Sequence, residues 1–368
     1  MSELLFAGNE KKEIILNAGY VRSKMPEARH WQSNLLAILI FGANFSAYLL
    51  TFAAIIFVPF WIIKIIAIAL NGLFTGGLFV VGHDACHGSF AANKTLNHIL
   101  GRIAFLPSLI TFSAWEVAHN QLHHGFTNLK PKDYPFVPLS KQEFDALPNR
   151  RKNLHRFYRT IFGVAFYYQI EVWWKHIVIP RKSDFEKMKR KVFIFDISLV
   201  AAFLLFEIVS LFFVPQYIAA HFGLELLSPL MLVLLAVILP FAVWSFLVAF
   251  VTLQHHTHPQ VRWFDKKSEW DFFNSQVKAS VRVELPRIVE ILFNNILEHT
   301  AHHVDSKIPL YNLRESQKSL ETAFSKDITV QAGSILQLHR TLKICKLYDY
   351  DNHQWLDFDG NVTSRIEI

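Results

Sequence analysis

Cysteine and charged residues are both scarce in this sequence. Two cysteines, Cys86 and Cys345, occur among 368 residues, which excludes a disulfide-held scaffold and a metal site built from thiolates. Charged residues make up 18% of the chain, against the roughly 25% typical of soluble globular domains. Hydrophobic residues make up 52%. A wholly soluble fold and a disordered chain are therefore both excluded, and a membrane protein is expected.

Long stretches without charge supply the hydrophobic excess. From Leu35 to Gly82 the single charged residue is Lys64, and this run is about twice the roughly 20 residues that cross a bilayer. It predicts a helical hairpin with spans over residues 35–58 and 62–82, turning near Pro59.

A second hairpin is predicted over residues 193–214 and 226–253, which gives four spans in total. The shorter apolar segments 103–115 and 160–180 are expected to be re-entrant or interfacial. Glu207 lies near the middle of the third predicted span. A carboxylate is costly there, so we expect it to have a partner or a function.

Basic residues gather on one predicted side of the membrane. They occur in the N-terminal segment 1–34 and in the connection 130–191, whereas the turn 215–229 contains neither Lys nor Arg. The positive-inside rule then places the N-terminal segment and the C-terminal tail 326–368 in the cytoplasm. The net charge of +7 is assigned to this topology and not to nucleic-acid binding. In a bacterium, the location expected is the inner membrane.

Histidine is the residue in excess. Eighteen are present, and eleven of them form four clusters. Spacings of three and four residues place side chains on one face of a helix. His83 is therefore expected to share a centre with His87, His119 with His123, and His299 with His302 and His303. Imidazole suits iron, zinc, copper and nickel, and eight or more nitrogens exceed what one ion holds, so two metal ions are predicted. The clusters are His83 and His87; His119, His123 and His124; His255, His256 and His258; and His299, His302 and His303.

The order and context of these clusters resemble the membrane fatty-acid desaturases. H-D-A-C-H-G-S-F at 83–90, L-Q-H-H-T-H-P at 253–259, E-W-D at 269–271 and A-H-H-V-D-S-K-I-P-L-Y at 301–311 are similar to the omega-6 and omega-3 branch of acyl-lipid desaturases. The resemblance covers residues 35–325, the expected desaturase domain. It implies an all-α integral membrane protein in which four transmembrane helices carry a cytosolic helical cap. The cap would hold a di-iron centre above an acyl tunnel.

The resemblance also implies the residues of the metal centre. In the H-T-H-P register it selects His256 and His258, with His258 the expected ligand, and leaves the additional His255 unassigned. The implied ligands are His83, His87, His119, His123, His124, His256, His258, His299, His302 and His303. A metal-bound imidazole usually donates its other N–H to a carboxylate or a carbonyl. Four carboxylates beside the clusters are candidates for that role: Asp84, Glu116, Glu298 and Asp305.

The activity implied is an O2-dependent desaturation that places a cis double bond in the acyl chain of a membrane lipid. An unactivated methylene chain requires an oxidant stronger than any side chain, so the step falls to two iron ions. The sequence lacks an H-P-G-G haem-binding stretch and a Gly-rich dinucleotide fingerprint. A separate electron donor, a ferredoxin or a cytochrome b5-like protein, is therefore implied.

Two alternatives stay open at the level of the sequence. A hydroxylase or ketolase acting on alkanes, carotenoids or sphingolipids also uses histidine clusters and differs only in its product. A histidine-rich membrane metal transporter would carry its ligands near the middle of its spans, whereas these clusters lie at the ends of the predicted spans.

Overall fold

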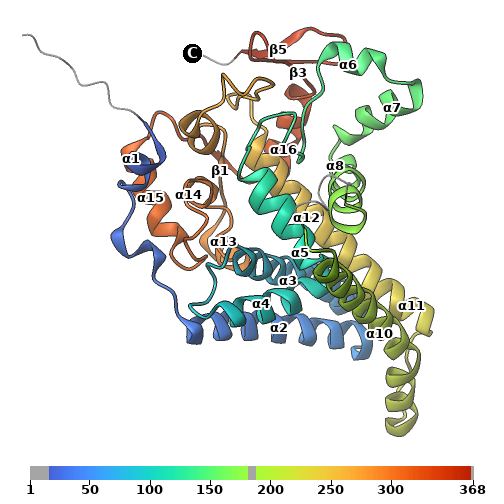
Figure 1. The fold of residues 1–368 in the computed structure, drawn as a ribbon. Coiled ribbons are helices and arrows are strands. Elements are labelled where there is room, and N and C mark those ends of the chain that lie inside the picture. Colours follow the sequence, from blue (N-terminus) through green and yellow to red (C-terminus); the bar gives the residue numbers. More distant parts are fainter. Residues whose placement is uncertain (1–15, 181–187, 366–368) are drawn as a thin grey trace, which may run out of the picture.

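Four long apolar helices dominate the structure, a computed structural model that describes residues 16–180 and 188–365 (Figure 1). Each is long and apolar enough to cross a membrane, so the prediction of four spans is confirmed. Residues 1–15, the first part of the predicted N-terminal segment, lie outside the described residues. The four are α2 (Asn34–Phe57), α3 (Trp61–His87), α10 (Arg190–Phe222) and a continuous helix over Pro229–His256, made of α11 (Pro229–Val233), the π-helical turn η5 (Leu234–Ile238) and α12 (Leu239–His256).

The first hairpin turns at a proline, as expected. Val58 has an extended backbone because it precedes Pro59, which ends α2. Lys64 is buried in the first turn of α3, and its Nζ donates to the carbonyl oxygens of Ile55 (2.5 Å) and Ile56 (3.2 Å). The last carbonyls of a helix lack partners within that helix. The single lysine of the hairpin therefore closes the C-terminus of α2.

The second hairpin differs from the prediction in where it turns. The sequence places the turn from Pro215 onward, but α10 continues through this proline to Phe222. Gly223 ends the helix in the left-handed region at φ 64°, a conformation that glycine adopts without strain. Proline is tolerated inside apolar helices where local adjustment satisfies the backbone groups it frees.

Glu207, the carboxylate inside the third span, has a hydrogen-bond partner. The hydroxyl of Tyr48 on α2 donates to Glu207 Oε1 at 2.5 Å. Tyr48 is buried, and Glu207 is half-buried. The pair joins α2 to α10, one helix from each hairpin, so it links the two hairpins within the apolar layer.

We expect Tyr48→Phe to lower the melting temperature of the protein in detergent, because the half-buried carboxylate of Glu207 loses its hydroxyl donor. Interhelical hydrogen bonds in membranes contribute about 1 kcal/mol. The double variant Tyr48→Phe/Glu207→Leu removes the carboxylate as well and should recover the stability. Equal melting temperatures for Tyr48→Phe and the unmodified protein would contradict this role.

The two shorter apolar segments do not form helices of spanning length within the described residues, as predicted. Asp196 on α10 holds the first segment, 103–115, against α10. Its carboxylate accepts hydrogen bonds from Arg102 Nε (2.7 Å) and from the backbone N–H of Ser113 (2.9 Å). The first segment is divided among α4 (Lys94–Phe105), the 3-10 turn η2 (Leu106–Ser108) and α5 (Phe112–Trp115). The second consists of α8 (Gly163–Tyr167) and the π-helix η4 (Tyr168–Val178).

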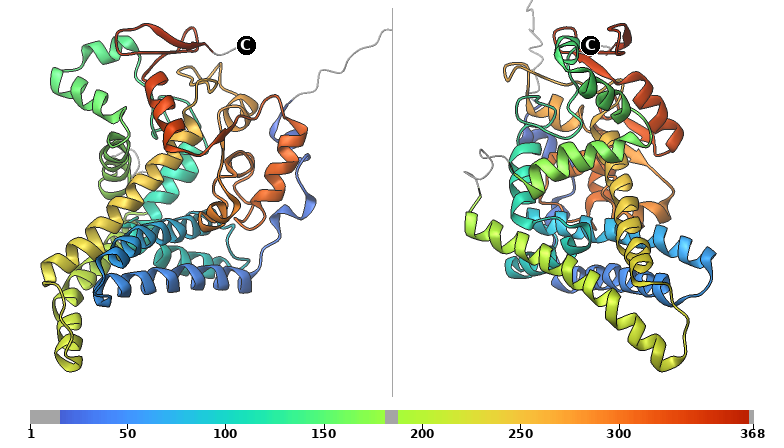
Figure 2. Two further views of the ribbon diagram at one scale, coloured as in Figure 1. Left: turned by 180° about the vertical axis from the view of Figure 1, so that it is seen from behind. Right: turned by 90° about the vertical axis from the view of Figure 1, so that its right-hand side faces the viewer.

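A mostly helical cap packs against α3 and α12. In Figures 1 and 2 it lies at the end of the molecule away from the tip formed by α10 and α11. Strands β1 and β2 pair in parallel, with Arg282 opposite Val330. The cap consists of α1 (Ala18–Arg22), the 3-10 turn η1 (Glu27–His30), the π-helical turn η6 (Phe273–Val277), β1 (Arg282–Glu284), α13 (Arg287–Leu292), α14 (His299–Val304), α15 (Leu313–Ala323) and β2 (Val330–Ala332).

The C-terminal residues, for which the sequence predicts only a tail, are folded. A three-stranded antiparallel sheet adds a small β element to the predicted all-α fold. Its Trp355 is fully buried with Trp263 and Tyr348, and Trp355 Nε1 donates to the carbonyl of His258 (3.0 Å). The sheet therefore holds the chain that follows α12. Helices α6 (Lys141–Ala146), α7 (Asn149–Tyr158) and α16 (Ile335–Ile344) lie with strands β3 (Leu347–Asp349), β4 (Gln354–Leu356) and β5 (Val362–Arg365).

Candidate metal centre

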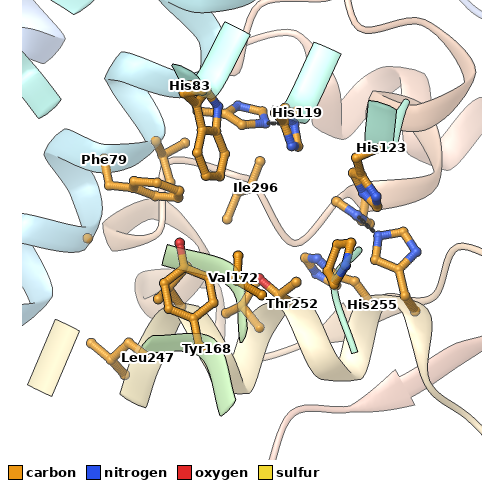
Figure 3. A pocket seen from close by; sticks show the side chains of 18 of the residues that line it. Phe79, His83, His119, His123, Tyr168, Val172, Leu247, Thr252, His255 and Ile296 are labelled. Carbon is orange, nitrogen blue, oxygen red and sulfur yellow. Dashed lines mark hydrogen bonds between the residues drawn. The ribbon is translucent and has the colours of Figure 1, made fainter. Parts of the chain in front are cut away.

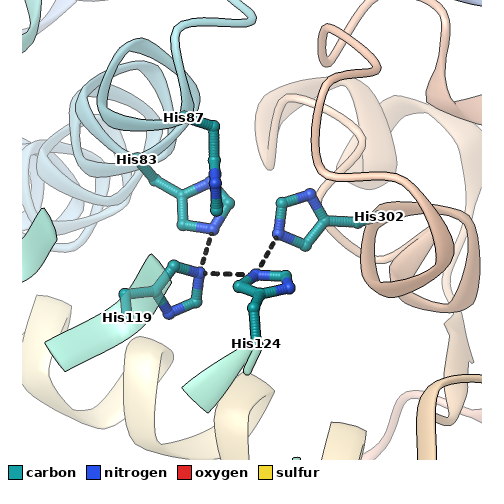
Figure 4. A group of neighbouring side chains, drawn as sticks. All are labelled: His83, His87, His119, His124 and His302. Atoms are coloured by element: carbon teal, nitrogen blue, oxygen red, sulfur yellow. Dashed lines mark hydrogen bonds between the residues drawn. The ribbon is translucent and has the colours of Figure 1, made fainter. Parts of the chain in front are cut away.

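Nine of the ten histidines predicted as ligands meet in two adjacent groups. Within each group, one nitrogen from every ring lies within 4.8 Å of the others. The first group is drawn in Figure 4, where five rings from three segments of chain turn toward one another. It comprises His83, His87, His119, His124 and His302, and the second comprises His123, His256, His299 and His303.

The last turn of α3 supplies two histidines to the first group. His83 and His87 are four residues apart and therefore lie on one face of the helix. Gly88 ends α3 at φ 67°, in a left-handed conformation that favours glycine. Both rings are buried, and the chain leaves the helix immediately beyond the site.

A π-helix divides the second cluster between the two groups. The sequence predicts that His119 and His123 share a centre, but the structure pairs His119 with His124 and sends His123 to the other group. The reason is that Glu116–His123 (η3) is π-helical, and His124 N–H donates to the carbonyl of His119 at 3.0 Å. In a π-helix the hydrogen bond joins residues five apart. Residues 119 and 124 therefore share a face.

The last cluster is divided as well, contrary to the prediction of one common centre. His299 and His303, four residues apart on α14, face the second group, and His302 faces the first. His256 enters the second group from the last turn of α12. The rings of His124 and His303 stack with their centroids 4.4 Å apart, so the two groups touch.

His258 does not join either group, unlike the expectation from the H-T-H-P register. Helix α12 ends at His256, and Thr257 has an extended backbone that carries the chain away. The Nδ1 of His258 accepts from the backbone N–H of Gln260 (3.1 Å). Of the two histidines that the H-T-H-P register selects, His256 therefore lies in a group and His258 does not.

Distances between ring nitrogens fit metal coordination. The Nε2 atoms of His83 and His119 are 2.7 Å apart, and those of His256 and His299 are 2.9 Å apart. Two nitrogens about 2.1 Å from one ion and at right angles would lie about 3 Å apart. His303 Nε2 is buried and makes no hydrogen bond within the described residues. These nitrogens are therefore available to metal ions.

The rings are also in the protonation state that ligation requires. Burial, and then repulsion from neighbouring imidazoles, holds the pKa of five of them well below its ordinary value. They are neutral at pH 7, with lone pairs for a cation. The five are His119, His124, His299, His302 and His303.

Hydrogen bonds to the outer nitrogens orient three of the grouped histidines. His83 Nδ1 lies 3.2 Å from Oδ1 of Asp84, one of the four candidate carboxylates. His123 Nδ1 lies 2.9 Å from Asp133 Oδ1, and His303 Nδ1 lies 2.9 Å from Gln276 Oε1. Partners of this kind fix the tautomer and leave Nε2 to face the metal.

The other three predicted carboxylates have different partners. Glu116 is exposed on the outer face of η3. Glu298 accepts from Arg282 Nε at 2.8 Å, and Asp305 bonds Arg29 and His30. Of the carboxylates chosen because they lie beside a cluster in the sequence, Asp84 alone contacts a grouped histidine through its outer nitrogen. The same criterion missed Asp133 and Gln276, which are distant in sequence.

An apolar cavity extends from both groups into the helices. It lies between α3, η4 and α12, and its free space, counted together with the open solvent at its mouth, is about 720 Å³. Figure 3 shows His83, His119 and His123 at one end, with Phe79, Tyr168 and Leu247 around the rest. Its walls are almost wholly hydrophobic or aromatic, which suits an extended apolar ligand.

Two residues that the sequence left unassigned lie at the site. His255 is buried beside the cavity, and its ring stacks on that of His299 with centroids 3.7 Å apart. It packs against His299 without belonging to either group. Cys86 is buried, and its Sγ contacts the carbonyl of Phe112 at 3.5 Å. It therefore packs α3 against α5.

We expect Asp133→Asn to weaken metal binding about tenfold or more, as is typical when a partner of a ligand is changed. Asn has the same size but no charge, so it orients His123 less strongly. Competition with a chelator measures the effect. Asp145→Asn is the matched control, because Asp145 is exposed and pairs with Lys141. Equal metal affinity in both variants would refute the role given to Asp133.

Comparison with known proteins supports the resemblance seen in the sequence. Residues 59–331 match the family model described as fatty acid desaturase. The chloroplastic omega-6 fatty acid desaturase of Spinacia oleracea is 27% identical over 297 residues, which are 80% of this chain and 61% of that protein. The sn-1 oleoyl-lipid 12-desaturase of Synechocystis sp. is 28% identical over 324 residues, 88% of this chain and 84% of that protein. The chain thus spans about three fifths of the spinach relative.

Proposed function

Because this chain belongs to the fatty acid desaturase family, we propose that it introduces a cis double bond into the acyl chain of a membrane lipid, in an O2-dependent reaction of the omega-6 (delta-12) or omega-3 type. One observation carries this proposal: nine histidines, eight of them buried and His124 half-buried, form two touching groups that close the end of an apolar cavity. The relatives named as omega-6 and oleoyl-lipid 12-desaturases favour the same reaction.

The histidines are proposed to hold two iron ions, one in each group. Imidazole is a suitable ligand for iron, and the scarcity of thiolates and carboxylates at the groups fits an all-nitrogen site. When bound, the ions would supply the oxidising chemistry with O2 that no side chain can perform. Asp84, Asp133 and Gln276 would then hold the first ligand shell in place.

The chain itself is proposed to position the substrate. The cavity walls would enclose the methylene chain and exclude water, while the carbons to be desaturated lie beside His83, His119 and His123. Fixing one pair of carbons against the metal groups selects the position of the double bond. The hydrophobic walls contribute the binding free energy.

We further propose residues 35–325 as the desaturase domain, with cytoplasmic termini and, in a bacterium, a place in the inner membrane. The four apolar helices and the family make this a membrane protein. The basic residues on either side of the hairpins favour the orientation. The cap and the histidine groups would then face the cytoplasm, where a reduced ferredoxin or a cytochrome b5-like donor is available.

Expression in a host that makes only saturated and monounsaturated lipids tests the function. With a ferredoxin and its reductase supplied, the expected result is a new diene that is absent from cells expressing His303→Ala. A hydroxylated product without unsaturation would replace this proposal with the hydroxylase. Iron-loaded protein that leaves the lipid profile unchanged would overturn it.

A further inference from the structure

We propose that four residues on the cap side of the molecule, Phe126, Lys132, Lys267 and Trp270, form the docking surface for an acidic one-electron carrier protein. We call this surface the aromatic–lysine patch. We further propose that Trp270 and Thr127 connect the patch to the second histidine group. The inference rests on the proposed function, because only a reaction that consumes electrons requires such a surface.

The patch consists of two half-buried rings beneath two exposed lysines. Lys267 Nζ lies 3.2 Å from the ring centroid of Trp270 and 5.7 Å from that of Phe126. Lys132 Nζ lies 5.6 Å from Phe126, and the two rings are 6.4 Å apart. The lysines are therefore held over an aromatic surface instead of extending freely into solvent.

The charge of these two lysines is available to a partner. Within the described ranges, neither Lys132 nor Lys267 has a carboxylate within 4.0 Å, whereas the neighbouring Lys266 pairs with Asp351 (2.9 Å). The nearby acid Glu269 is engaged by Lys266 and by the ring of His353. The net positive charge of the patch thus complements an acidic protein surface.

A short series of contacts leads from the patch to two metal ligands. Trp270 Nε1 donates to the carbonyl of Thr127 at 2.8 Å. Thr127 Oγ1 donates to the carbonyl of His123 (2.8 Å) and lies 3.3 Å from His303 Nδ1. His123 and His303 both belong to the second group. Thr127 alone therefore separates the indole of Trp270 from His123 and His303 of the second group.

The electron balance requires a docking site of this kind. Reduction of O2 to two waters takes four electrons and four protons. The two C–H bonds that are lost supply two of each, so two electrons must come from a carrier and two protons from water. None of the four patch residues lines the cavity, so a carrier on the patch would leave the cavity mouth to the lipid.

The test is the reduction of purified, iron-loaded protein in nanodiscs by a pre-reduced plant-type [2Fe–2S] ferredoxin, followed by stopped-flow absorbance. We expect Lys132→Glu/Lys267→Glu to slow the second-order step about tenfold or more at low salt, with the difference vanishing at high salt. Reduction by dithionite should be unchanged. The control is Lys318→Glu/Lys326→Glu, which places the same charges on exposed positions elsewhere on the cap.

Trp270→Phe tests the connection from Trp270 through Thr127 to the second histidine group separately from docking of the carrier on the patch. The phenyl ring keeps the aromatic surface but lacks the N–H that bonds Thr127. We expect slower reduction at saturating ferredoxin with an unchanged half-saturating concentration and unchanged iron content. An unchanged rate of reduction at saturating ferredoxin in Trp270→Phe would contradict the connection.

Failure of this inference and failure of the proposed function give different results. If the unmodified protein makes no diene with either reductant, the function is wrong. If it makes the diene and Lys132→Glu/Lys267→Glu is reduced by ferredoxin as fast as the control, the docking surface is wrong. Loss of binding to phosphatidylglycerol vesicles with normal ferredoxin reduction would assign the patch to lipid and also overturn the inference.

Discussion

Alanine at position 256 is expected to abolish desaturation, and alanine at position 258 to leave most of it. His256 supplies one of the four nitrogens that the described residues bring to the second group, and its Nε2 lies 2.9 Å from that of His299. Loss of a ligand should lower activity by about a hundredfold or more, because changes to the partners of ligands already cost ten- to a hundredfold. His258 bonds the backbone N–H of Gln260 and contributes nothing to either group.

Two measurements distinguish the variants: the number of iron ions per protein, determined by mass spectrometry, and the amount of diene per cell. His256→Ala should lose one of two ions, and His258→Ala should retain both. The carbonyl of residue 258 still accepts from Trp355 in the second variant, so the C-terminal sheet keeps its contact. The opposite pattern, with iron lost only from His258→Ala, would return the ligand role to His258.

Leucine in place of Gly76 is expected to block the substrate while leaving the metal centre intact. Gly76 lines the cavity, and a Cβ added there would lie 3.9 Å from Trp244 Cδ1, an ordinary contact. The rest of the leucine side chain must then project into the cavity. Turnover of long acyl chains should fall about tenfold or more, given that single methylene differences in apolar pockets already change rates by similar factors.

Shorter acyl chains should lose less activity than long ones, because they leave room for the added side chain. Gly42→Leu is the matched control, since Gly42 lies on α2 with no atom within 4 Å of an added Cβ. Both variants should bind the same amount of iron. Unchanged turnover in Gly76→Leu would mean that the acyl chain lies elsewhere.

The spans and the identity of nine clustered histidines follow from the sequence, because charge-free length and residue type are local properties. The turn near Pro59 is also a local signal, since proline restricts the residue before it. Pro215, in contrast, misled the prediction. The effect of a proline inside a helix depends on whether neighbouring groups satisfy the backbone groups that it frees, and composition does not encode this.

The division of the histidines between two groups depends on geometry that spacing alone does not give. A regular α-helix would bring His119 and His123 together, and only the π-helix reverses this. Asp133 and Gln276 reach their histidines through turns of the chain, ten and 27 residues away in sequence. No periodic pattern could have indicated either one.

The division of ligands along the chain also fixes when the site can be completed during synthesis. Both groups take members from the region up to His124 and from α14, so even the first group requires His302. The first hairpin can enter the membrane long before that residue is made. Metal loading would therefore come late in synthesis, and a chain stalled before α14 would carry the histidines of the first hairpin without His302 to complete the first group.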